Sequence, residues 1–283
     1  MSISCRSCRS LLVVAFALIL ALPAEARKFR ILSFNILVDR GPHWDARKVQ
    51  VGEFIRKNHP DVFGLQEPTK PQMDDLAPYL KDYAYVGVAR DDGKEQGEYS
   101  PVYYRTDRYR ALKSGTFWLS ETPEAPSYGW DANCRRVCSW ALLQDKVSGK
   151  LFVFANTHLD HIGKVARRNG ALLIKERLTA LVPAGTPLMV TGDFNVEDTE
   201  EAYITMTTGG IPLGDAYKMA RKRTGCKTTF HAWGKIPDEK AYKIDFIFLS
   251  PQLKVKRAEI FNSYLAPDQY LSDHHPHFVD LKW

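Results

Sequence analysis

The spacing of hydrophobic residues along the 283-residue chain predicts both strands and helices. Residues 28–38 alternate with the period of two that is typical of a strand. Residues 164–182 repeat apolar positions every three or four residues and predict the clearest helix. One face of the strand would carry Phe29, Ile31, Ser33 and Asn35, and the inward face of the helix would carry Ala171, Leu172, Ile174, Leu178 and Leu181.

Shorter periodic segments fill most of the remaining chain. Helices are also predicted in 44–58, where Val49, Phe54 and Ile55 would face the core, and in 71–80 and 200–207. The short links between 101 and 157 imply antiparallel neighbours, and helical crossovers are implied elsewhere. Two packed β-sheets with helices on the outside follow from this order of elements. The remaining predicted strands are 61–65, 83–89, 101–105, 109–119, 139–146, 150–157, 187–191, 243–249, 255–262 and 277–281.

The first 26 residues have the pattern of a cleaved signal peptide. Arg6 and Arg9 precede an apolar run over 11–22, and residues 24–26 form an A-x-A cleavage site. The run is too short for a transmembrane helix, which needs about 20 apolar residues. No cysteine follows the run to hold a lipid. We therefore expect an exported protein, periplasmic or secreted, with no stable membrane anchor and one mature domain over 27–283.

Composition narrows the class of protein further. The chain is 45% hydrophobic, which is enough for one large α/β domain. Its net charge of +6 becomes +5 without residues 1–26, because two arginines and one glutamate are lost. This mild basicity suits an anionic substrate but is weak evidence. Cys134 and Cys138 either form a disulfide or remain unrelated thiols, and Cys226 would be left over.

Polar residues mark one end of several predicted hydrophobic strands. Such groups are costly to bury without partners, so we expect them to converge around a shared ion and a phosphate. Asp193 and Asn195 are two residues apart and therefore face the same way along a strand. The set comprises Asn35 in "ILSFN", Glu67 in "VFGLQE", Asn156 and His158 in "FVFANTH", Asp193 and Asn195 in "LMVTGDFN", Asp245 in "YKID", and Asp273 and His274 in "LSDHHP".

The residue types suggest what this site would bind. Oxygen ligands without thiols favour Mg²⁺, Mn²⁺ or Ca²⁺. His158 and His274 could exchange protons with a substrate near neutral pH, each beside an orienting carboxylate, for which Asp245 and Glu98 are the candidates. A zinc site remains an alternative, built from His158, His161, His274, His275 and His277.

Six short motifs occur in an order that resembles one family. The sequence resembles the endonuclease/exonuclease/phosphatase superfamily, the group that includes deoxyribonuclease I. Within this superfamily it resembles an exported bacterial branch of unknown substrate. The resemblance implies a four-layer α/β sandwich of two packed mixed β-sheets flanked by helices. It also implies phosphoester hydrolysis that depends on Mg²⁺ or Mn²⁺. The motifs are "SFNI" at 33–36, "LQE" at 65–67, "NTHLDH" at 156–161, "GDFN" at 192–195, "KIDFIF" at 243–248 and "SDHHP" at 272–276.

The resemblance also implies a role for each candidate residue. Glu67 resembles the principal metal ligand, with Asn35 and Asp273 nearby. Asp193 and Asn195 resemble the residues that hold the attacking water and a phosphate oxygen. His274 resembles the essential histidine, oriented by Asp245, and His158 resembles a second histidine, supported by Glu98. Arg136 matches an arginine that contacts phosphate, although Arg135 is adjacent.

Together these features predict an exported, metal-dependent phosphoester hydrolase that acts as a monomer on a phosphorylated substrate. Nucleic acid and nucleotides are among the candidate substrates. One alternative is an inactive phosphate- or nucleic-acid-binding protein of the same fold. Another is an enzyme similar to phospholipase C or sphingomyelinase. The basic stretch 217–235 either grips polyphosphate or nucleic acid or forms a solvated charged loop. The sequence leaves open the substrate and the choice between monoester and diester.

Overall fold

The computed structural model contains two large mixed sheets. It describes residues 28–38, 43–181, 183–267 and 269–283. In the first sheet the strand order is β10-β12-β15-β1-β2-β4-β3, and in the second it is β5-β6-β7-β8-β11-β9. A separate hairpin pairs β13 with β14. The predicted signal peptide and cleavage site over 1–26 lie outside the described residues.

The elements follow the predicted order closely. The helices are α1 (His43–Asn58), α2 (Lys70–Leu76), α3 (Lys164–Leu181), α4 (Glu201–Thr207) and α5 (Ala216–Met219), with 3-10 turns at Ala77–Tyr79 and Asp238–Lys240. The first-sheet strands are β1 (Lys28–Asn35), β2 (Val62–Gln66), β3 (Tyr83–Val86), β4 (Val102–Arg105), β10 (Lys222–Gly225), β12 (Lys254–Ile260) and β15 (His277–Lys282). The others are β5 (Tyr109–Trp118), β6 (Val137–Asp145), β7 (Leu151–His158), β8 (Leu188–Asp193), β9 (Gly214–Asp215), β11 (Asp245–Leu249), β13 (Tyr264–Ala266) and β14 (Gln269–Tyr270).

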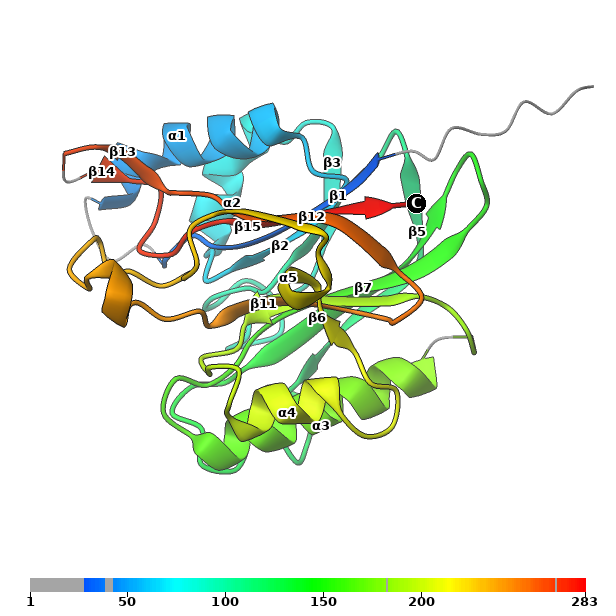
Figure 1. Cartoon of the computed structure of the whole chain (residues 1–283). Helices are drawn as coiled ribbons and strands as arrows, with labels where there is room; N and C mark the ends of the chain where they lie inside the picture. The colour runs from blue at the N-terminus through cyan, green and yellow to red at the C-terminus, as the bar shows by residue number, and fades with distance from the viewer. Residues whose placement is uncertain (1–27, 39–42, 182, 268) are drawn as a thin grey trace, which may run out of the picture.

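The two sheets pack face to face between two layers of helices. Figure 1 shows α1 and α2 above the first sheet and α3 and α4 below the second. In β1, Phe29 and Ile31 point into the core between the sheets, whereas Leu32 and Phe34 pack toward the α1 and α2 layer. This alternation explains why the strand is apolar on both faces. The expected four-layer sandwich is confirmed.

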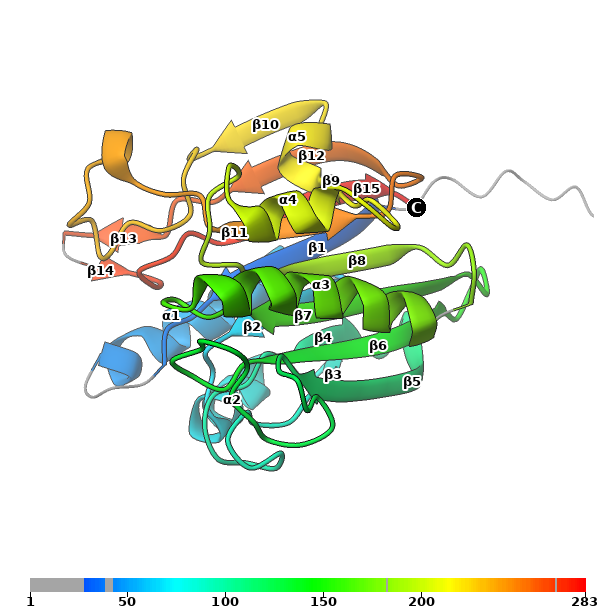
Figure 2. The ribbon, with the colours of Figure 1, turned by 90° about the horizontal axis from the view of Figure 1, so that it is seen from below.

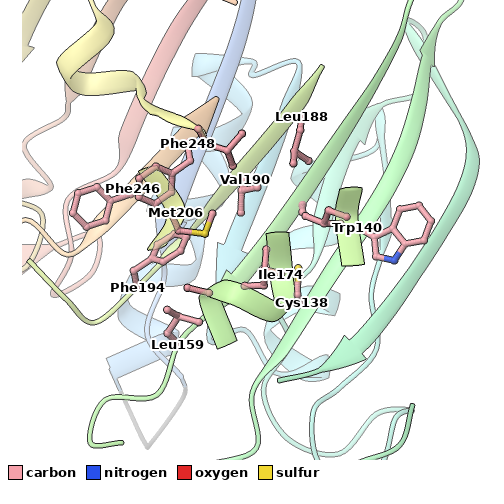
Figure 3. Close-up of a cluster of buried hydrophobic side chains, with 14 of the residues drawn as sticks. Cys138, Trp140, Leu159, Ile174, Leu188, Val190, Phe194, Met206, Phe246 and Phe248 are labelled. Carbon is pink, nitrogen blue, oxygen red and sulfur yellow. The ribbon is translucent and has the colours of Figure 1, made fainter. Parts of the chain in front are cut away.

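A third hydrophobic core lies between the second sheet and its helices. Figure 2 shows α3 and α4 running across that sheet. Ile174 of α3 and Met206 of α4 meet Phe194 and Phe248 in this core, as Figure 3 shows. Lys175 is also buried, and its Nζ donates 2.8 Å hydrogen bonds to Thr205 O and Gly209 O at the end of α4. A cation at this position satisfies carbonyl groups that a helix end leaves free.

A buried polar layer joins the two sheets just behind the strand ends. The side chain of Asn156 in β7 donates to Leu65 O at 2.6 Å and Pro101 O at 3.0 Å. Its Oδ1 accepts from Gln66 Nε2 at 2.6 Å and from Thr191 Oγ1 at 2.9 Å. Gly64 permits this approach, because a Cβ there would overlap Asn156 and Thr191. The layer therefore fixes the position of β2 relative to β7 and β8.

Three of the residues predicted to face inward do not do so. Val49, Leu172 and Leu181 are exposed, although Phe54, Ile55, Ala171, Ile174 and Leu178 are buried as predicted. Val49 lies two positions from Val51, about 200° around the helix, so it points away from the sheet. The same geometry turns Leu172 away from the buried face defined by Ala171 and Ile174.

Several short elements were not predicted because they are polar or span only a few residues. They are β9, α5, β10, β13 and β14. The basic stretch 217–235 therefore contains the end of α5 and all of β10 as well as a loop. In the part of the chain that the structure describes, no helix is long and apolar enough to span a membrane.

Candidate active site

The polar strand ends converge on one pocket of about 360 Å³. β1 and β2 supply Asn35 and Glu67 from the first sheet, and the second sheet supplies the ends of β7, β8 and β11. Asp193 lies beside His158 on one side and Asp245 on the other, in the register of the second sheet. Of the predicted site residues, Glu67, Glu98, Arg136, His158, Asp193, Asn195, Asp273 and His274 line the pocket, whereas Asn35 and Asp245 lie directly behind it.

His274 lies between two carboxylates. Its Nδ1 is 2.8 Å from Asp245 Oδ2, and its Nε2 is 3.7 Å from Asp193 Oδ2. Burial alone would lower the pKa of His274, but the charge and hydrogen bond of Asp245 and the charge of Asp193 raise it. Burial and the charge of Asp245 raise the pKa of Asp193 against the opposing effect of His274. The arrangement favours an imidazolium that faces Asp193 in the pocket.

Asn195 binds the second histidine. Its Nδ2 lies 3.0 Å from His158 Nε2 and donates to Leu159 O at 3.0 Å, so both amide hydrogens have acceptors. This geometry makes Nε2 the acceptor and Nδ1 the protonated nitrogen of His158. Burial, with the charges of Arg136 and Arg90, lowers the pKa of His158 well below its usual value. To donate a hydrogen bond to a phosphate, Asn195 would first have to break its hydrogen bond to His158.

Glu67, which follows β2, and Asp273, in the loop before β15, present carboxylate oxygens to the pocket. Asn35 Nδ2 donates to Glu67 Oε1 at 3.0 Å and to Asp193 Oδ2 at 3.1 Å, which connects the two sheets. Burial raises the pKa of Asp273, and the charge of Glu67 raises it further. Two carboxylates that oppose each other in this way fit a divalent cation, which would offset their repulsion. Members of this set are the oxygen donors that Mg²⁺ prefers.

Two of the predicted residues at this site have unusual backbone conformations. Glu67 has φ of 71° and Asn195 has φ of 49°, both in the left-handed region. Asparagine tolerates that region, but a glutamate there is uncommon. Strained conformations cluster at functional sites, where the surrounding structure must hold them. Here Val38 N donates to Glu67 Oε2 at 2.9 Å, and Asn195 N donates to Asp193 Oδ1 at 2.9 Å.

Arg136 offers a positive charge with free donors. The residue is buried, and its Nε and Nη1 have no hydrogen-bond partner among the described residues. Its Nη2 lies 3.2 Å from His161 Nδ1, and its Nε forms a 3.6 Å ion pair with Asp160. Unpaired guanidinium donors at a pocket wall suit an anionic oxygen.

The predicted pairing of Glu98 with His158 is not formed. Glu98 accepts hydrogen bonds from Arg90 Nη1 at 2.6 Å and Arg90 Nη2 at 2.9 Å, and Nδ1 of His158 has no hydrogen-bond partner in the described chain. A bidentate ion pair with an arginine is stronger than a single bond to a neutral imidazole, which explains the difference. Arg90 lines the same pocket and was not predicted, because it lies in an irregular loop without periodic pattern.

The structure leaves two of the five histidines of the zinc alternative outside the pocket that His158, His161 and His274 line. His277 is fully buried in the last strand, and His275 bonds to Ser263 Oγ at 2.9 Å away from the pocket. The two clusters of described residues whose side chains could hold a metal are Asp193, Asp245 and His274, and Cys134, Asp160 and His161. Cys134 and Cys138 are free thiols, so the disulfide alternative is not realised.

This sandwich, with carboxylates, amides and imidazoles gathered across its two sheets, is that of a phosphoester hydrolase. The model of the Endonuclease/Exonuclease/phosphatase family matches residues 32–274, and the chain belongs to that family. Enzymes of this family generally depend on a divalent metal, and the oxygen ligands of the pocket agree with that property.

Solved structures give related matches. An endonuclease/exonuclease/phosphatase from Bacteroides vulgatus is 45% identical, with a TM-score of 0.86 over 90% of this chain and 98% of that chain. A mannosyl-6-phosphatase from Bacteroides thetaiotaomicron is 36% identical, with a TM-score of 0.82 over 90% of this chain and 100% of that chain.

A curated relative is more distant. Nocturnin of Drosophila melanogaster is 26% identical over 310 residues, which cover 89% of this chain and 46% of nocturnin. The chain thus spans about half the length of the nocturnins that it matches.

Proposed function

We propose that this protein is an exported, Mg²⁺-dependent phosphatase that acts on phosphorylated sugars. The observation that carries the proposal is the continuous contact from His274 through Asp193 and Asn35 to Glu67, which joins proton-transfer groups to metal ligands. Similarity to a mannosyl-6-phosphatase over the whole of that chain supports the substrate class.

Glu67, Asn35 and Asp273 would hold the Mg²⁺ ion, which would act as a Lewis acid toward the phosphate. Arg136 would bind a phosphate oxygen through Nη1, which has no hydrogen-bond partner among the described residues. Asp193 would orient the attacking water and accept its proton, since its buried carboxylate has a raised pKa. His274, held protonated by Asp245, would supply the proton that the departing sugar oxygen takes and would then regain one from Asp193.

A substrate panel tests this function. The protein with Mg²⁺ should release phosphate from mannose 6-phosphate faster than it cleaves bis(p-nitrophenyl) phosphate, single-stranded RNA or DNA, or sphingomyelin. EDTA should abolish the activity, and His274→Ala serves as the inactive control. Faster cleavage of a nucleic acid or a lipid would replace the sugar substrate. No hydrolysis of any phosphoester with Mg²⁺ or Mn²⁺ would favour the inactive binding protein.

The basic stretch 217–235 gives little support to nucleic acid as the substrate. A pocket of about 310 Å³ beside it is lined by Lys218, Arg223, Lys227 and Lys243, but Lys218 pairs with Asp198 at 2.9 Å and Lys243 with Asp215 at 3.4 Å. These carboxylates offset part of the positive charge that a phosphate backbone would need.

Export rests on the sequence of the first 26 residues. If the signal is cleaved after Ala26, the mature protein from a bacterial host begins at Arg27. Mass spectrometry of the N-terminal peptide from the periplasmic and secreted fractions decides this point. A mature protein that retains residues 1–26 in the cytoplasm would contradict it.

A further inference from the structure

A second pocket lies apart from the catalytic one. It has a volume of about 480 Å³ and is walled by α1, the loop after β10, and the β13–β14 hairpin. These segments reach the same end of the molecule in Figures 1 and 2. Its lining residues are His43, Ala46, Arg47, Gln50, Trp233, Lys235, Leu265, Gln269 and Tyr270. We call it the aromatic pocket.

The aromatic pocket is built on the backs of two segments that carry candidate metal ligands. Arg47 is buried, and its Nη1 donates to Ile36 O at 2.9 Å and to Leu271 O at 2.6 Å. Ile36 follows Asn35 directly, and Leu271 precedes Asp273 by two residues. Arg47, which lines the aromatic pocket, therefore fixes the backbone beside the catalytic pocket, and the two pockets are neighbours.

The loop that carries Trp233 joins the two pockets from the other side. Phe230 lines the catalytic pocket and pairs with His274 in an isolated bridge. One residue further on, His231 N donates to Asp273 O at 3.1 Å. Trp233 then enters the aromatic pocket only two residues later. The loop from Phe230 to Trp233 therefore borders both pockets.

Trp233 is held in a strained position. Ala232, Trp233 and Gly234 have φ of 48°, 63° and 72°, so three consecutive residues lie in the left-handed region. A bulky residue rarely adopts that conformation. Hydrogen bonds from Gly234 N to His231 Nδ1 at 3.0 Å and from Lys235 N to Ala232 O at 3.2 Å hold the loop. Such strain is often stored at ligand clamps.

The chemistry of the lining fits a sugar ring. Trp233 and Tyr270 present aromatic surface on which the C–H face of a hexose can pack. Gln50 and Gln269 each carry a donor and an acceptor, which matches hydroxyl groups that both donate and accept. Lys235 adds a donor, and no carboxylate is among the lining residues. Arg47 Cζ lies 5.2 Å from the centre of the Trp233 ring and covers one face of the indole.

From these observations we infer that the aromatic pocket binds an unphosphorylated hexose unit of the substrate. The natural substrate would then be a phosphorylated oligosaccharide rather than a free sugar phosphate. This inference rests on the proposed function, because it specifies what is attached to the phosphorylated sugar in the catalytic pocket.

A binding experiment tests the pocket without any reaction. An unphosphorylated mannose disaccharide is titrated into the full chain, and tryptophan fluorescence and saturation-transfer NMR are recorded. We expect saturable binding that Trp233→Ala and Gln269→Ala both weaken about tenfold, a loss of about 1.4 kcal/mol. Tyr85→Ala, which removes an exposed aromatic ring from edge strand β3, should bind like the wild type. Absence of binding, or binding insensitive to both pocket variants, overturns the inference.

A kinetic experiment connects the pocket to the substrate. The ratio of kcat/KM for a phosphorylated mannose disaccharide to kcat/KM for mannose 6-phosphate should exceed one. Trp233→Ala should reduce that ratio about tenfold, Trp233→Phe should restore part of it, and Tyr85→Ala should leave it unchanged. A ratio that Trp233→Ala does not change contradicts the inference, as does Trp233-dependent binding of AMP in place of the disaccharide.

The two experiments separate the inference from the proposed function. If neither sugar phosphate is hydrolysed but the disaccharide still binds at Trp233, the proposed function fails and the sugar pocket stands. If mannose 6-phosphate is hydrolysed but the disaccharide neither binds nor reacts faster, the inference alone fails. Melting temperatures of each variant show whether a loss of binding results from unfolding.

Discussion

Nδ1 of His274 lies 2.8 Å from Oδ2 of Asp245, although the two residues are 29 positions apart. Asp245 begins β11 of the second sheet, and His274 lies in the loop before β15 of the first sheet. The contact fixes the ring so that Nε2 faces Asp193 in the catalytic pocket. A buried carboxylate that orients an imidazole and stabilises its protonated form is a recurring feature of hydrolases.

Asp245→Asn tests this orientation. The amide keeps the shape of the side chain but removes the charge that stabilises the imidazolium of His274. We expect kcat to fall by about 10²–10⁴-fold, as is typical for the loss of an acid–base group, with little change in melting temperature. Asp107→Asn, which alters an exposed carboxylate paired with Arg105, is the matched control. Wild-type turnover in Asp245→Asn would remove this pair from the mechanism.

Asn195 gives a second prediction. Asn195→Asp places a negative charge beside the phosphate and replaces the amide that donates to His158. Asn195→Ala removes the same bond without adding charge. We therefore expect Asn195→Asp to raise KM more than Asn195→Ala does. Both variants must also occupy φ of 49°, so Asn195→Gly is the control for backbone strain. Equal KM values in the Asp and Ala variants would contradict the predicted position of the phosphate.

Glu67 gives a third prediction, on the metal. Glu67→Gln keeps the length of the side chain at a residue whose φ is 71°. It removes one negative charge from the proposed metal ligands. The Mg²⁺ concentration for half-maximal activity should rise by more than about tenfold, a loss of more than about 1.4 kcal/mol in metal binding. Titrating EDTA-treated protein with Mg²⁺ measures this. Full activity in EDTA, or identical titrations of the two proteins, would show that Glu67 is not a metal ligand.

Asp160 gives a prediction about stability and pH. Its carboxylate accepts hydrogen bonds from the backbone N–H groups of Asn133, Cys134, Ile162 and Gly163 at 2.7 to 3.1 Å. Burial opposes the charge, but these bonds outweigh burial and lower the pKa of Asp160 to about 2. The folded protein therefore holds the proton less tightly than the unfolded chain, whose aspartate pKa is about 3.9. The resulting stability is complete above about pH 4 and is lost as the pH falls toward about 2.

A pKa difference of nearly two units corresponds to a contribution of about 2.6 kcal/mol. Asp160→Asn should lower the free energy of unfolding at pH 7 and should flatten its fall between pH 4 and pH 2. Urea unfolding at several pH values measures both effects. Parallel pH curves for the wild type and the variant would mean that another carboxylate accounts for the acid sensitivity.

The sequence predicted those parts of the site that lie at the ends of regular strands. Asp193 and Asn195 follow a buried apolar strand, so their position could be read from the pattern alone. Glu98 could not be placed in the same way, because its partner Arg90 lies in the same irregular loop and only the fold brings the two side chains together. From the sequence alone, Lys175 would be assigned to the exposed face of its helix. It is buried because the fold places the end of α4 beside it.

The aromatic pocket was also beyond the sequence. The sequence alone does not distinguish a tryptophan in the hydrophobic core from one such as Trp233, which lines a pocket. The left-handed conformation of three consecutive residues depends on contacts with His231 and Asp273, which follow from tertiary structure. Predictions based on periodicity are therefore strong for strands and helices and weak for the loops that shape the ligand pockets.

Because the side chain of Asn156 links the two sheets, the geometry of the active site depends on how the sheets pack together. The first sheet supplies Asn35 and Glu67, and the second supplies His158, Asp193 and Asp245. Asn156 connects the two sheets through its contacts with Gln66 and Gly64. A slight parting of the halves would separate these groups while every strand stayed paired within its own sheet. On heating, enzymatic activity should therefore disappear before the far-ultraviolet circular dichroism changes, and Asn156→Ala should widen that interval.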